Sequence, residues 1–463
     1  MARVREEIKC IPTNTEKYIS FSLGNLRFVD SVNFLLSCLD NLVKGSNEFP
    51  IMHRTVPEEN KRRLLLKKGI YPYEYMDLFE RFGETELPEK EKFYSSLSGK
   101  GITDEEYAHA KDVWMTFGCQ NLGDYHDLYV ATDVLLLADV FENFRKVCQQ
   151  KYGLDPGHYY SARGLSWDAL LKKSGVELAS LTDMDMHLFI ERGMRGGISM
   201  VSKRHAKANN PLVEGYDPAE PTNYITYRDA NNLYRWAMSL PLPKKGFHWK
   251  RVMPTEEQIT TMKWNWKKGW ILEVDLEYPE ELHDAHSDYP LAPEKKAIKP
   301  EQILEYQRRL MVDLNLTMPN TEKLVLTLED KEKYVVHYKN LQFYLSQGMR
   351  LKKVHRVIEV DQEPWMEPHI RMNTEFRNRA KSDFEVDFYQ LMNNSVFGKT
   401  LESQKNRTDV KIVRDWKSDK IRKLVSSPSF DRFTIFGNDM TGIHMHKTKL
   451  VLNKTVYTGM KIL

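Results

Sequence analysis

The spacing of apolar and polar positions predicts a mixture of helices and strands along this chain. Apolar residues recur at helical spacing in the ranges 57–68, 103–117 and 125–152, which is typical of amphipathic helices. Two runs rich in β-branched and aromatic residues, 224–227 and 270–278, are typical of strands. We therefore expect a mixed α/β (α+β) fold.

A carboxylate follows the first of these predicted strands. Asp229 stands at its end, and the pair Leu233 and Tyr234 follows after two asparagines. A carboxylate at a strand end is a rigid mount for Mg²⁺, which prefers oxygen ligands and leaves room for substrate phosphates. The alternative is a strand-to-helix turn in which Asp and Asn only supply turn and capping chemistry.

A second candidate segment runs from Asp387 to Thr400. An amphipathic helix that ends at Gly398, a common C-cap residue, would account for its shape. It would not account for the sequence Asn-Asn-Ser at 393–395, so this segment is also a candidate for substrate binding.

Together the two segments resemble a known family. The stretch around Asp229 to Tyr234 resembles motif A of the palm domain of family B DNA polymerases, and most closely the protein-primed polymerases of Maverick (Polinton) transposons and related viruses. The segment at 387–400 resembles motif B of the fingers helix. Motif B matches at Asn394, Ser395 and Gly398, but it departs from the family at Gln390 and Phe397, where the family has Lys and Tyr.

The resemblance implies roles for these residues. Asp229 would be the catalytic residue and would bind Mg²⁺ or Mn²⁺, and Tyr234 would exclude a ribose 2′-hydroxyl. A glutamine at 390 can donate a hydrogen bond to a phosphate but carries no charge, which weakens catalysis of phosphoryl transfer. The implied nucleotide-binding residues are Leu233, Tyr234, Gln390, Asn394, Ser395, Phe397 and Gly398.

An earlier pair resembles part of a proofreading nuclease. Tyr129 and Asp133 are four residues apart on a predicted helix, so they share one face. They resemble the third motif of the 3′–5′ exonuclease domain in this family, where the Tyr orients water and the Asp binds metal. In the family this motif works with an Asp-x-Glu motif upstream. Asp104 and Glu106 have that spacing, but Thr103 and Glu106 are better explained as a helix capping box.

Two further features point to nucleic acid. Gly196 and Gly197 lie in a segment that resembles the family's Tyr-x-Gly-Gly linker, where glycines let the backbone approach the template strand. From residue 331 onward the chain has 25 Lys and Arg against 15 Asp and Glu, whereas the first 330 residues have 43 against 50. A basic surface fits DNA phosphates, although solvated helix faces are the alternative. Arg377 and Lys381, four apart, are expected on one DNA-binding face.

The resemblance implies an order of domains. An RNase H-like exonuclease domain, present in part, would precede an incomplete palm and fingers. The insertion that binds a protein primer is expected within the palm. The expected segments are 1–155 for the exonuclease part, 156–222 for the linker, 223–345 for the palm, 346–400 for the fingers and 401–463 for the return to the palm.

One family feature is missing from the sequence. Two-metal phosphoryl transfer needs at least two carboxylates, and the Asp-Thr-Asp of motif C does not occur after Gly398. We expect the chain as written to be a fragment that extends no primer and has no exonuclease activity. Two explanations stay open. The chain is either a fragment of an active protein-primed polymerase or a repurposed copy that binds DNA without catalysis.

Composition agrees with an intracellular DNA-processing protein. Four cysteines without metal-ligand spacing suit a reducing compartment, the nucleus or the cytoplasm, and no apolar run reaches transmembrane length. The expected partners are DNA template and primer, deoxynucleoside triphosphates and a terminal primer protein.

Three arginines depart from the family pattern. Arg228 precedes Asp229 on the predicted strand, so we expect it to point into packed protein. Arg163 and Arg235 stand where the family has proline and a small residue. An unpaired buried charge at these places would destabilise the fold.

Overall fold

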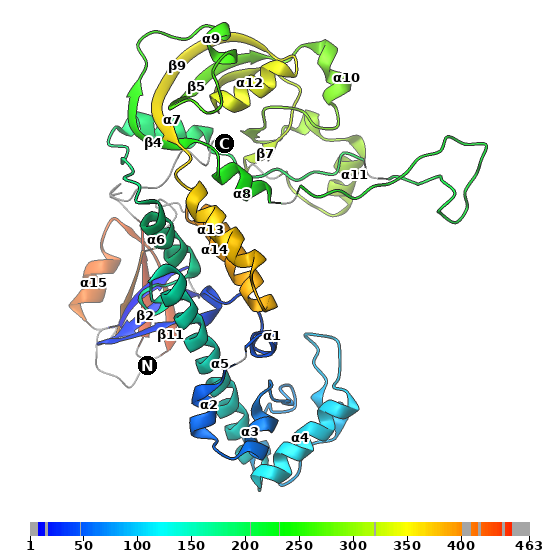
Figure 1. Ribbon diagram of the computed structural model, residues 1–463, viewed down its shortest axis with the longest axis vertical. Helices are drawn as coiled ribbons and strands as arrows, with labels where there is room; N and C mark the ends of the chain where they lie inside the picture. Colours follow the sequence, from blue (N-terminus) through cyan, green and yellow to red (C-terminus); the bar gives the residue numbers. More distant parts are fainter. Residues whose placement is uncertain are drawn as a thin grey trace. The chain divides into compact units, whose positions relative to one another are not determined.

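The structure is a computed structural model that divides into two compact units (Figure 1). Unit 1 comprises residues 1–173, 371–395 and 404–449, and unit 2 comprises 174–370, 396–403 and 450–463. The described residues are 8–13, 17–46, 48–203, 205–230, 232–318, 321–400, 409–414, 418–437 and 440–446.

Unit 1 is built mainly from helices. The predicted helical ranges 57–68, 103–117 and 125–152 are confirmed by α3, α4 and α5. The helices with residues in this unit are α1 (Leu39–Lys44), α2 (Pro50–Thr55), α3 (Glu59–Leu65), α4 (Asp104–Phe117), α5 (Leu122–Tyr152), α6 (Ala162–Ser174), α13 (Glu367–Asn378), α14 (Asp383–Thr400) and α15 (Asp419–Val425). Of these, α6, α13 and α14 contribute residues to both units.

Local sequence signals set the ends of the two longest early helices. Thr103 and Glu106 form the predicted capping box at the start of α4, and Asn121 caps α5 through the backbone amide of Asp124 at 3.0 Å. Each helix ends at a glycine in the left-handed conformation, Gly118 at φ 67° and Gly153 at φ 62°, where other residues would be strained.

The core of unit 1 lies along α5. Its buried face includes Leu136 and Phe144, which pack with Met52 of α2 and Phe388 of α14. Asp139 is fully buried on the same helix, and its carboxylate accepts hydrogen bonds from the amides of Ile51 and Met52 at 2.7 and 2.8 Å. The carboxylate thereby satisfies free amides at the first turn of α2, which compensates its burial.

Two small antiparallel sheets complete unit 1. One has the order β1 (Ile8–Pro12), β2 (Tyr18–Leu23), β3 (Leu26–Val29), and the other has the order β10 (Asp409–Val413), β12 (Met440–Met445), β11 (Phe430–Gly437). Cys10 Sγ on β1 lies 3.8 Å from the carbonyl oxygen of Val410 on β10. All four cysteines of the chain are free thiols.

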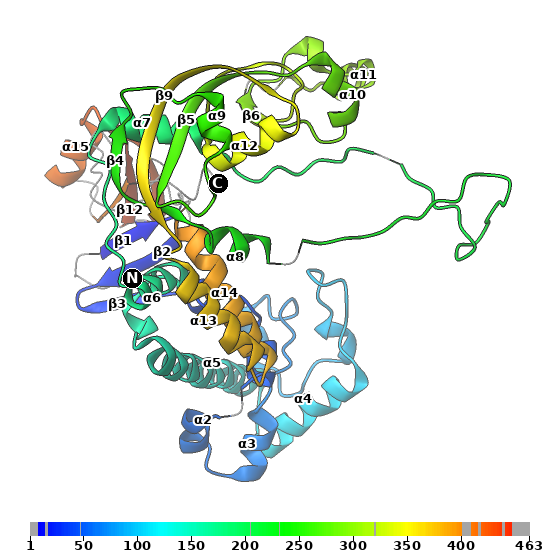
Figure 2. The same cartoon turned by 45° about the horizontal axis from the view of Figure 1, so that its top comes forward.

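Unit 2 is organised around a four-stranded antiparallel sheet in the order β4 (Leu242–Trp249), β9 (Arg350–Glu363), β5 (Lys268–Glu277), β8 (Lys331–His337). The predicted strand at 270–278 is confirmed by β5. Both faces of the sheet are covered, because Ile271 packs with α7 (Met184–Gly193) and Leu272 packs with α9 (Glu256–Thr260) and α12 (Tyr338–Ser346). Figure 2 shows α9 and α12 beside the sheet.

The remaining elements of unit 2 are short. His283 and His286 lie on the short helix α10 (His283–His286), and both hydrogen-bond to Tyr278. The other elements are α8 (Leu233–Met238), α10 (His283–His286), α11 (Glu305–Asp313), β6 (Glu294–Lys296) and β7 (Lys323–Val325), and the 3₁₀ turns of the chain are Ser31–Asn33, Phe79–Gly83, Lys90–Phe93, Pro156–His158, Glu280–Leu282 and Pro300–Gln302.

The mixed α/β class expected from the sequence is confirmed. Each compact unit is assembled from several separate stretches of the sequence. The five expected segments are consecutive, so their boundaries remain a prediction. Much of 401–463 lies outside the described residues. Among the described helices, none combines the length and the apolar character needed to cross a membrane.

Lys339 gives a prediction of pH-dependent stability. Burial lowers the pKa of its ammonium group to about 8, and its Nζ lies 3.5 Å from the carbonyl oxygen of Pro241. At pH 7 the folded protein therefore holds a charge that burial disfavours, whereas the unfolded chain keeps the proton up to roughly pH 10.4. Between these pKa values the unfolded state binds more protons, so wild-type stability rises with pH.

We expect Lys339→Met to raise the free energy of unfolding at pH 7, and the gain to shrink as pH increases from about 8 to about 10. Urea unfolding of both proteins across this range measures the difference. A gain that does not change with pH would show that the charge of Lys339 is not its origin.

Candidate functional site

The segment before Asp229 differs from its predicted structure. Residues 224–230 form no strand and are exposed, with Tyr227 95% exposed. A strand needs a neighbour for its backbone hydrogen bonds, and the pairing recorded next to this run is a single bridge between Asn209 and Asn223. The predicted strand at 224–227 is therefore wrong, and Asp229 is carried by an exposed loop.

The three arginines differ in their exposure. Arg228 is exposed, so the prediction that it points into packed protein is wrong, because its segment is not part of a sheet. Arg163 is also exposed on α6. Arg235 on α8 is buried, with 7% of its surface exposed, and it has an interaction partner. None of the three is an unpaired buried charge.

Tyr234 and Phe397 are brought into contact within unit 2. Asn232, with a left-handed φ of 64°, precedes α8, which carries Leu233 and Tyr234; Asn231 lies outside the described residues. The rings of Tyr234 and Phe397 have centroids 4.8 Å apart and an interplanar angle of 41°. Leu233 and Tyr234 are 57% and 56% exposed, so the aromatic pair has an open face.

The helix α14 continues past its predicted end. Gly398 lies inside it and the helix runs to Thr400, whose hydroxyl donates to the carbonyl oxygen of Phe397 at 2.7 Å. The alternative explanation, in which the helix ends at Gly398, is therefore wrong. Gln390, Asn394 and Phe397 are spaced by four and three residues, so they share one face of α14.

In unit 1 the same helix forms one wall of a cleft of about 1050 Å³. Gln390 and Asn394 line it, together with Lys381 and with residues of α1. Asn394 is exposed, whereas Ser395 is buried with 6% of its surface exposed. The cleft thus combines amide groups and two lysines, Lys44 and Lys381, with the carboxylates of Asp383 and Asp387. Its amide and ammonium groups can donate hydrogen bonds to oxygen acceptors such as phosphate.

Arg377 and Lys381 do not share a helix face as expected. The helix α13 ends at Asn378, and Lys381 lies beyond it. The backbone amide of Lys381 donates to Glu385 Oε2 at 2.7 Å, which ties it to the start of α14 instead. The four-residue spacing was misleading because the helix stops between the two positions.

Gly196 and Gly197 lie in an exposed stretch without secondary structure. A Cβ atom at either position would meet none of the described residues within 4 Å, so packing against them does not require glycine there. The neighbouring Arg195 was not singled out from the sequence. It donates to the carbonyl oxygen of Val335 at 2.8 Å and stacks over the Tyr334 ring at 3.8 Å, which anchors this stretch on β8.

Tyr129 and Asp133 lie on α5 in unit 1, in an aromatic cluster. The Tyr129 ring stacks on Tyr71 at 4.7 Å, and its hydroxyl hydrogen-bonds to Tyr73. Burial raises the pKa of Tyr129, and its hydrogen bonds to Tyr73 and Asp133 raise that pKa further. Asp133 Oδ1 is buried without a hydrogen-bond partner, so a polar acceptor is available beside the tyrosine.

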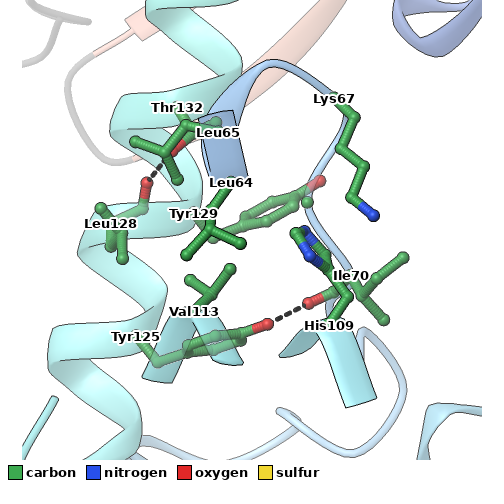
Figure 3. Close-up of a pocket in the computed structure, with 11 residues that line it drawn as sticks. Leu64, Leu65, Lys67, Ile70, His109, Val113, Tyr125, Leu128, Tyr129 and Thr132 are labelled. Carbon is green, nitrogen blue, oxygen red and sulfur yellow. Dashed lines mark hydrogen bonds between the residues drawn. The ribbon is translucent and has the colours of Figure 1, made fainter. Parts of the chain in front are cut away.

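A small cavity of about 20 Å³, roughly the size of one water molecule, lies beside this cluster (Figure 3). Tyr129, Tyr125 and Thr132 line it from α5, and Gly69 lines it from the segment that follows α3. The hydroxyl of Tyr125 donates to the carbonyl oxygen of Ile70 at 2.6 Å. Such a volume holds no nucleotide, so the cavity is a packing feature next to the predicted nuclease residues.

The side chains of the described residues do not fit a complete metal centre. Within those ranges no group of three His, Cys, Asp or Glu is placed to hold an ion. The roles of Asp229 and Asp133 as single metal ligands therefore remain predictions. No chemical step is assigned to a metal. What the described residues do offer is an exposed carboxylate, an open aromatic pair and a polar cleft.

Comparison with known proteins gives structural neighbours only. No protein-family model matches the chain, and no curated protein does. A phi29 DNA polymerase complexed with primer-template DNA (post-translocation binary complex) is 13% identical with a TM-score of 0.45, and the match covers 98% of this chain and 59% of that chain. A phi29 DNA polymerase complexed with single-stranded DNA is 15% identical with a TM-score of 0.42, covering 98% and 59%.

A phi29 DNA polymerase ternary complex with primer-template DNA and incoming nucleotide is 12% identical with a TM-score of 0.44, covering 98% and 60%. The chain thus spans less than two thirds of the length of these structures. At these identities and TM-scores the likeness assigns no function to the residues described above.

The aromatic cluster around Tyr129 gives a prediction. A Cβ atom at Gly69 would lie 2.7 Å from Cδ2 of Tyr129, and that ring is held by Tyr71 and Tyr73. We expect Gly69→Ala to destabilise the protein by about 1–3 kcal/mol, the usual cost of overpacking, as measured by urea unfolding.

Gly83→Ala is the matched control, because a Cβ atom there meets nothing within 4 Å. In a Tyr129→Ala background the cost of Gly69→Ala should largely disappear. An equal cost in both backgrounds would show that the Tyr129 ring is not what excludes a larger residue at position 69.

Proposed function

We propose that this chain carries the nucleotide-binding part of a DNA-directed DNA polymerase. The observation that carries the proposal is the contact between the Tyr234 and Phe397 rings, at 4.8 Å. These residues are far apart in sequence, and each belongs to a segment that independently resembles a nucleotide-binding motif of family B polymerases. A shared binding site requires the two segments to meet, so the contact supports the proposal.

The aromatic pair would form the wall against which the incoming nucleotide packs. Tyr234 is 56% exposed, so one part of its ring packs on Phe397 and the rest can lie against a deoxyribose. In the proposed role, a ribose 2′-hydroxyl would collide with that ring and exclude ribonucleotides. Phe397 keeps the flat face of the family's tyrosine and lacks only its hydroxyl.

Asp229 would contribute one carboxylate near the nucleotide. It lies five residues before Tyr234 on an exposed loop, and Mg²⁺ is commonly held by one or two carboxylates together with substrate phosphates and water. We propose Asp229 as one such ligand for Mg²⁺ or Mn²⁺. The proposal assigns it a binding role that can be tested without catalysis.

The cleft in unit 1 would contact phosphates through Lys381, Gln390 and Asn394. The amides of Gln390 and Asn394 donate hydrogen bonds, and Lys381 supplies a positive charge. Arg377, Gly196 and Gly197 are proposed DNA contacts on the family resemblance alone. Tyr129 and Asp133 are likewise proposed as an exonuclease remnant on the resemblance alone. Replication of a mobile element or virus from a terminal primer protein is proposed on the same ground.

A nucleotide-binding experiment tests the central proposal. Fluorescent mant-dATP is titrated into the full chain with a primer-template duplex and Mn²⁺. We expect Tyr234→Ala to weaken binding roughly 5-fold or more, because the deoxyribose loses the apolar ring surface against which it packs. The same variant should bind dATP and ATP more equally in competition, whereas Tyr234→Phe should retain both properties.

Tyr227→Ala is the matched control, because Tyr227 is an exposed tyrosine in the same stretch. Asp229→Asn should remove the dependence of binding on Mn²⁺ without changing the thermal midpoint. Wild-type affinity in both Tyr234→Ala and Phe397→Ala would overturn the proposed site. Primer extension with and without Asp229 then separates a catalytic chain from one that only binds DNA.

A further inference from the structure

A loop in unit 2 presents two tryptophans to solvent. Residues 261–267, which we call the tryptophan loop, connect α9 to β5. Trp264 is 60% exposed and Trp266 is 44% exposed, although tryptophan is usually well buried in folded proteins. Phe343 of α12 is 52% exposed, and it lines the same surface groove as Trp264.

The backbone of the tryptophan loop is fixed from beneath. The Gln342 side chain donates to the carbonyl oxygens of Ile259 and Met262 at 2.7 and 2.8 Å. The buried Tyr338 hydroxyl donates to the carbonyl oxygen of Trp264 at 3.3 Å.

The buried Gln362 side chain donates to the carbonyl oxygen of Trp266 at 2.8 Å. The backbone amide of Gln362 donates to the carbonyl oxygen of Lys267 at 2.8 Å. Donors from α12 and β9 therefore bond to several carbonyl groups of the loop. The backbone is held in place, so the exposed indoles lie on a preorganised support, which lowers the entropic cost of binding.

The groove beside the loop is open and about 830 Å³ in volume. It is lined by Trp264, Lys263 and Asn265 from the loop, by Phe343 and Gln342 from α12, and also by Glu256 of α9. Its walls thus combine flat aromatic surface with polar groups. A planar ligand can lie against the rings while its polar edge contacts the amides.

The charge of the loop is positive. Lys263 and Lys267 flank the two tryptophans, both are exposed, and neither forms an ion pair within the part of the chain that the structure describes. The next lysine, Lys268, is paired with Asp361 at 2.6 Å. The loop itself contains no acidic residue, so two positive charges are available beside the aromatic surface.

We propose that the tryptophan loop binds single-stranded DNA. Aromatic side chains stack on bases of any sequence, while neighbouring lysines contact the phosphate backbone. Bases would stack on Trp264, Trp266 and Phe343, and phosphates would lie near Lys263 and Lys267. The site uses neither Asp229 nor the pair Tyr234 and Phe397, so it goes beyond the proposed nucleotide site and does not depend on it.

Binding of a labelled 15-nucleotide oligo-dT to the full chain, followed by fluorescence anisotropy, tests this inference. We expect Trp264→Ala/Trp266→Ala to weaken binding about tenfold or more, since each stacked base contributes about 1–3 kcal/mol. Trp264→Phe/Trp266→Phe should restore most of the affinity, because an aromatic face remains. Tyr306→Ala, at an exposed tyrosine of α11, is the control and should bind as wild type.

The lysines give a second readout. For single strands the slope of log K against log salt is about −0.7 for each phosphate contact. Lys263→Gln/Lys267→Gln should therefore make the slope shallower by roughly 1.4, whereas Lys295→Gln, at an exposed lysine of β6, should leave it unchanged. Unchanged oligo-dT affinity and salt slope in the loop variants would overturn the proposal.

Two further outcomes are decisive. If the loop variants lose binding to anionic phosphatidylserine vesicles but keep oligo-dT affinity, the loop is a lipid contact and the proposal is wrong. The oligo-dT titrations are repeated in a Tyr234→Ala background. A loss on Trp264→Ala/Trp266→Ala that persists there supports the loop even when the mant-dATP experiment fails, so the two proposals are tested separately.

Discussion

A chain of buried hydrogen bonds fixes α14, and the residues of the unit 1 cleft depend on it. The Tyr152 hydroxyl on α5 donates to Asn373 Oδ1 on α13 at 2.8 Å, and Asn373 Nδ2 donates to Asn393 Oδ1 on α14 at 2.8 Å. Each of these buried hydrogen bonds contributes about 0.5–1.5 kcal/mol to the free energy of unfolding. Asn393 is thereby held in the core, so Asn394, about 100° further round the helix, is exposed toward the cleft.

The two predicted strands show what sequence can and cannot specify. Both runs are rich in β-branched and aromatic residues, yet 270–278 became a central strand and 224–227 did not. The strand β5 has β8 and β9 on either side and helices on both faces. Composition therefore indicated that a strand could form, and the available neighbours decided whether it did. Arg228 was misplaced for the same reason.

Helix ends were predictable where a local signal sets them. The capping box at Thr103 acts within four residues, so the sequence contains it completely. The spacing of Arg377 and Lys381 contained no such information, because the end of α13 at Asn378 was not apparent. Likewise the contact of Tyr234 with Phe397 is long-range, and only the resemblance of their segments suggested that they meet. Arg195 and the tryptophan loop carried no recognised motif.

The candidate surfaces of unit 2 share one physical principle. An exposed aromatic ring adds little stabilising burial, so the backbone that carries it has to be held by other contacts. The backbone of Tyr234 belongs to the helix α8, and the backbone of Trp264 is held by a donor from α12. In both places the fold is stabilised by groups other than the exposed ring. The ring's free face is therefore available to a ligand, and replacing it should alter binding more than stability.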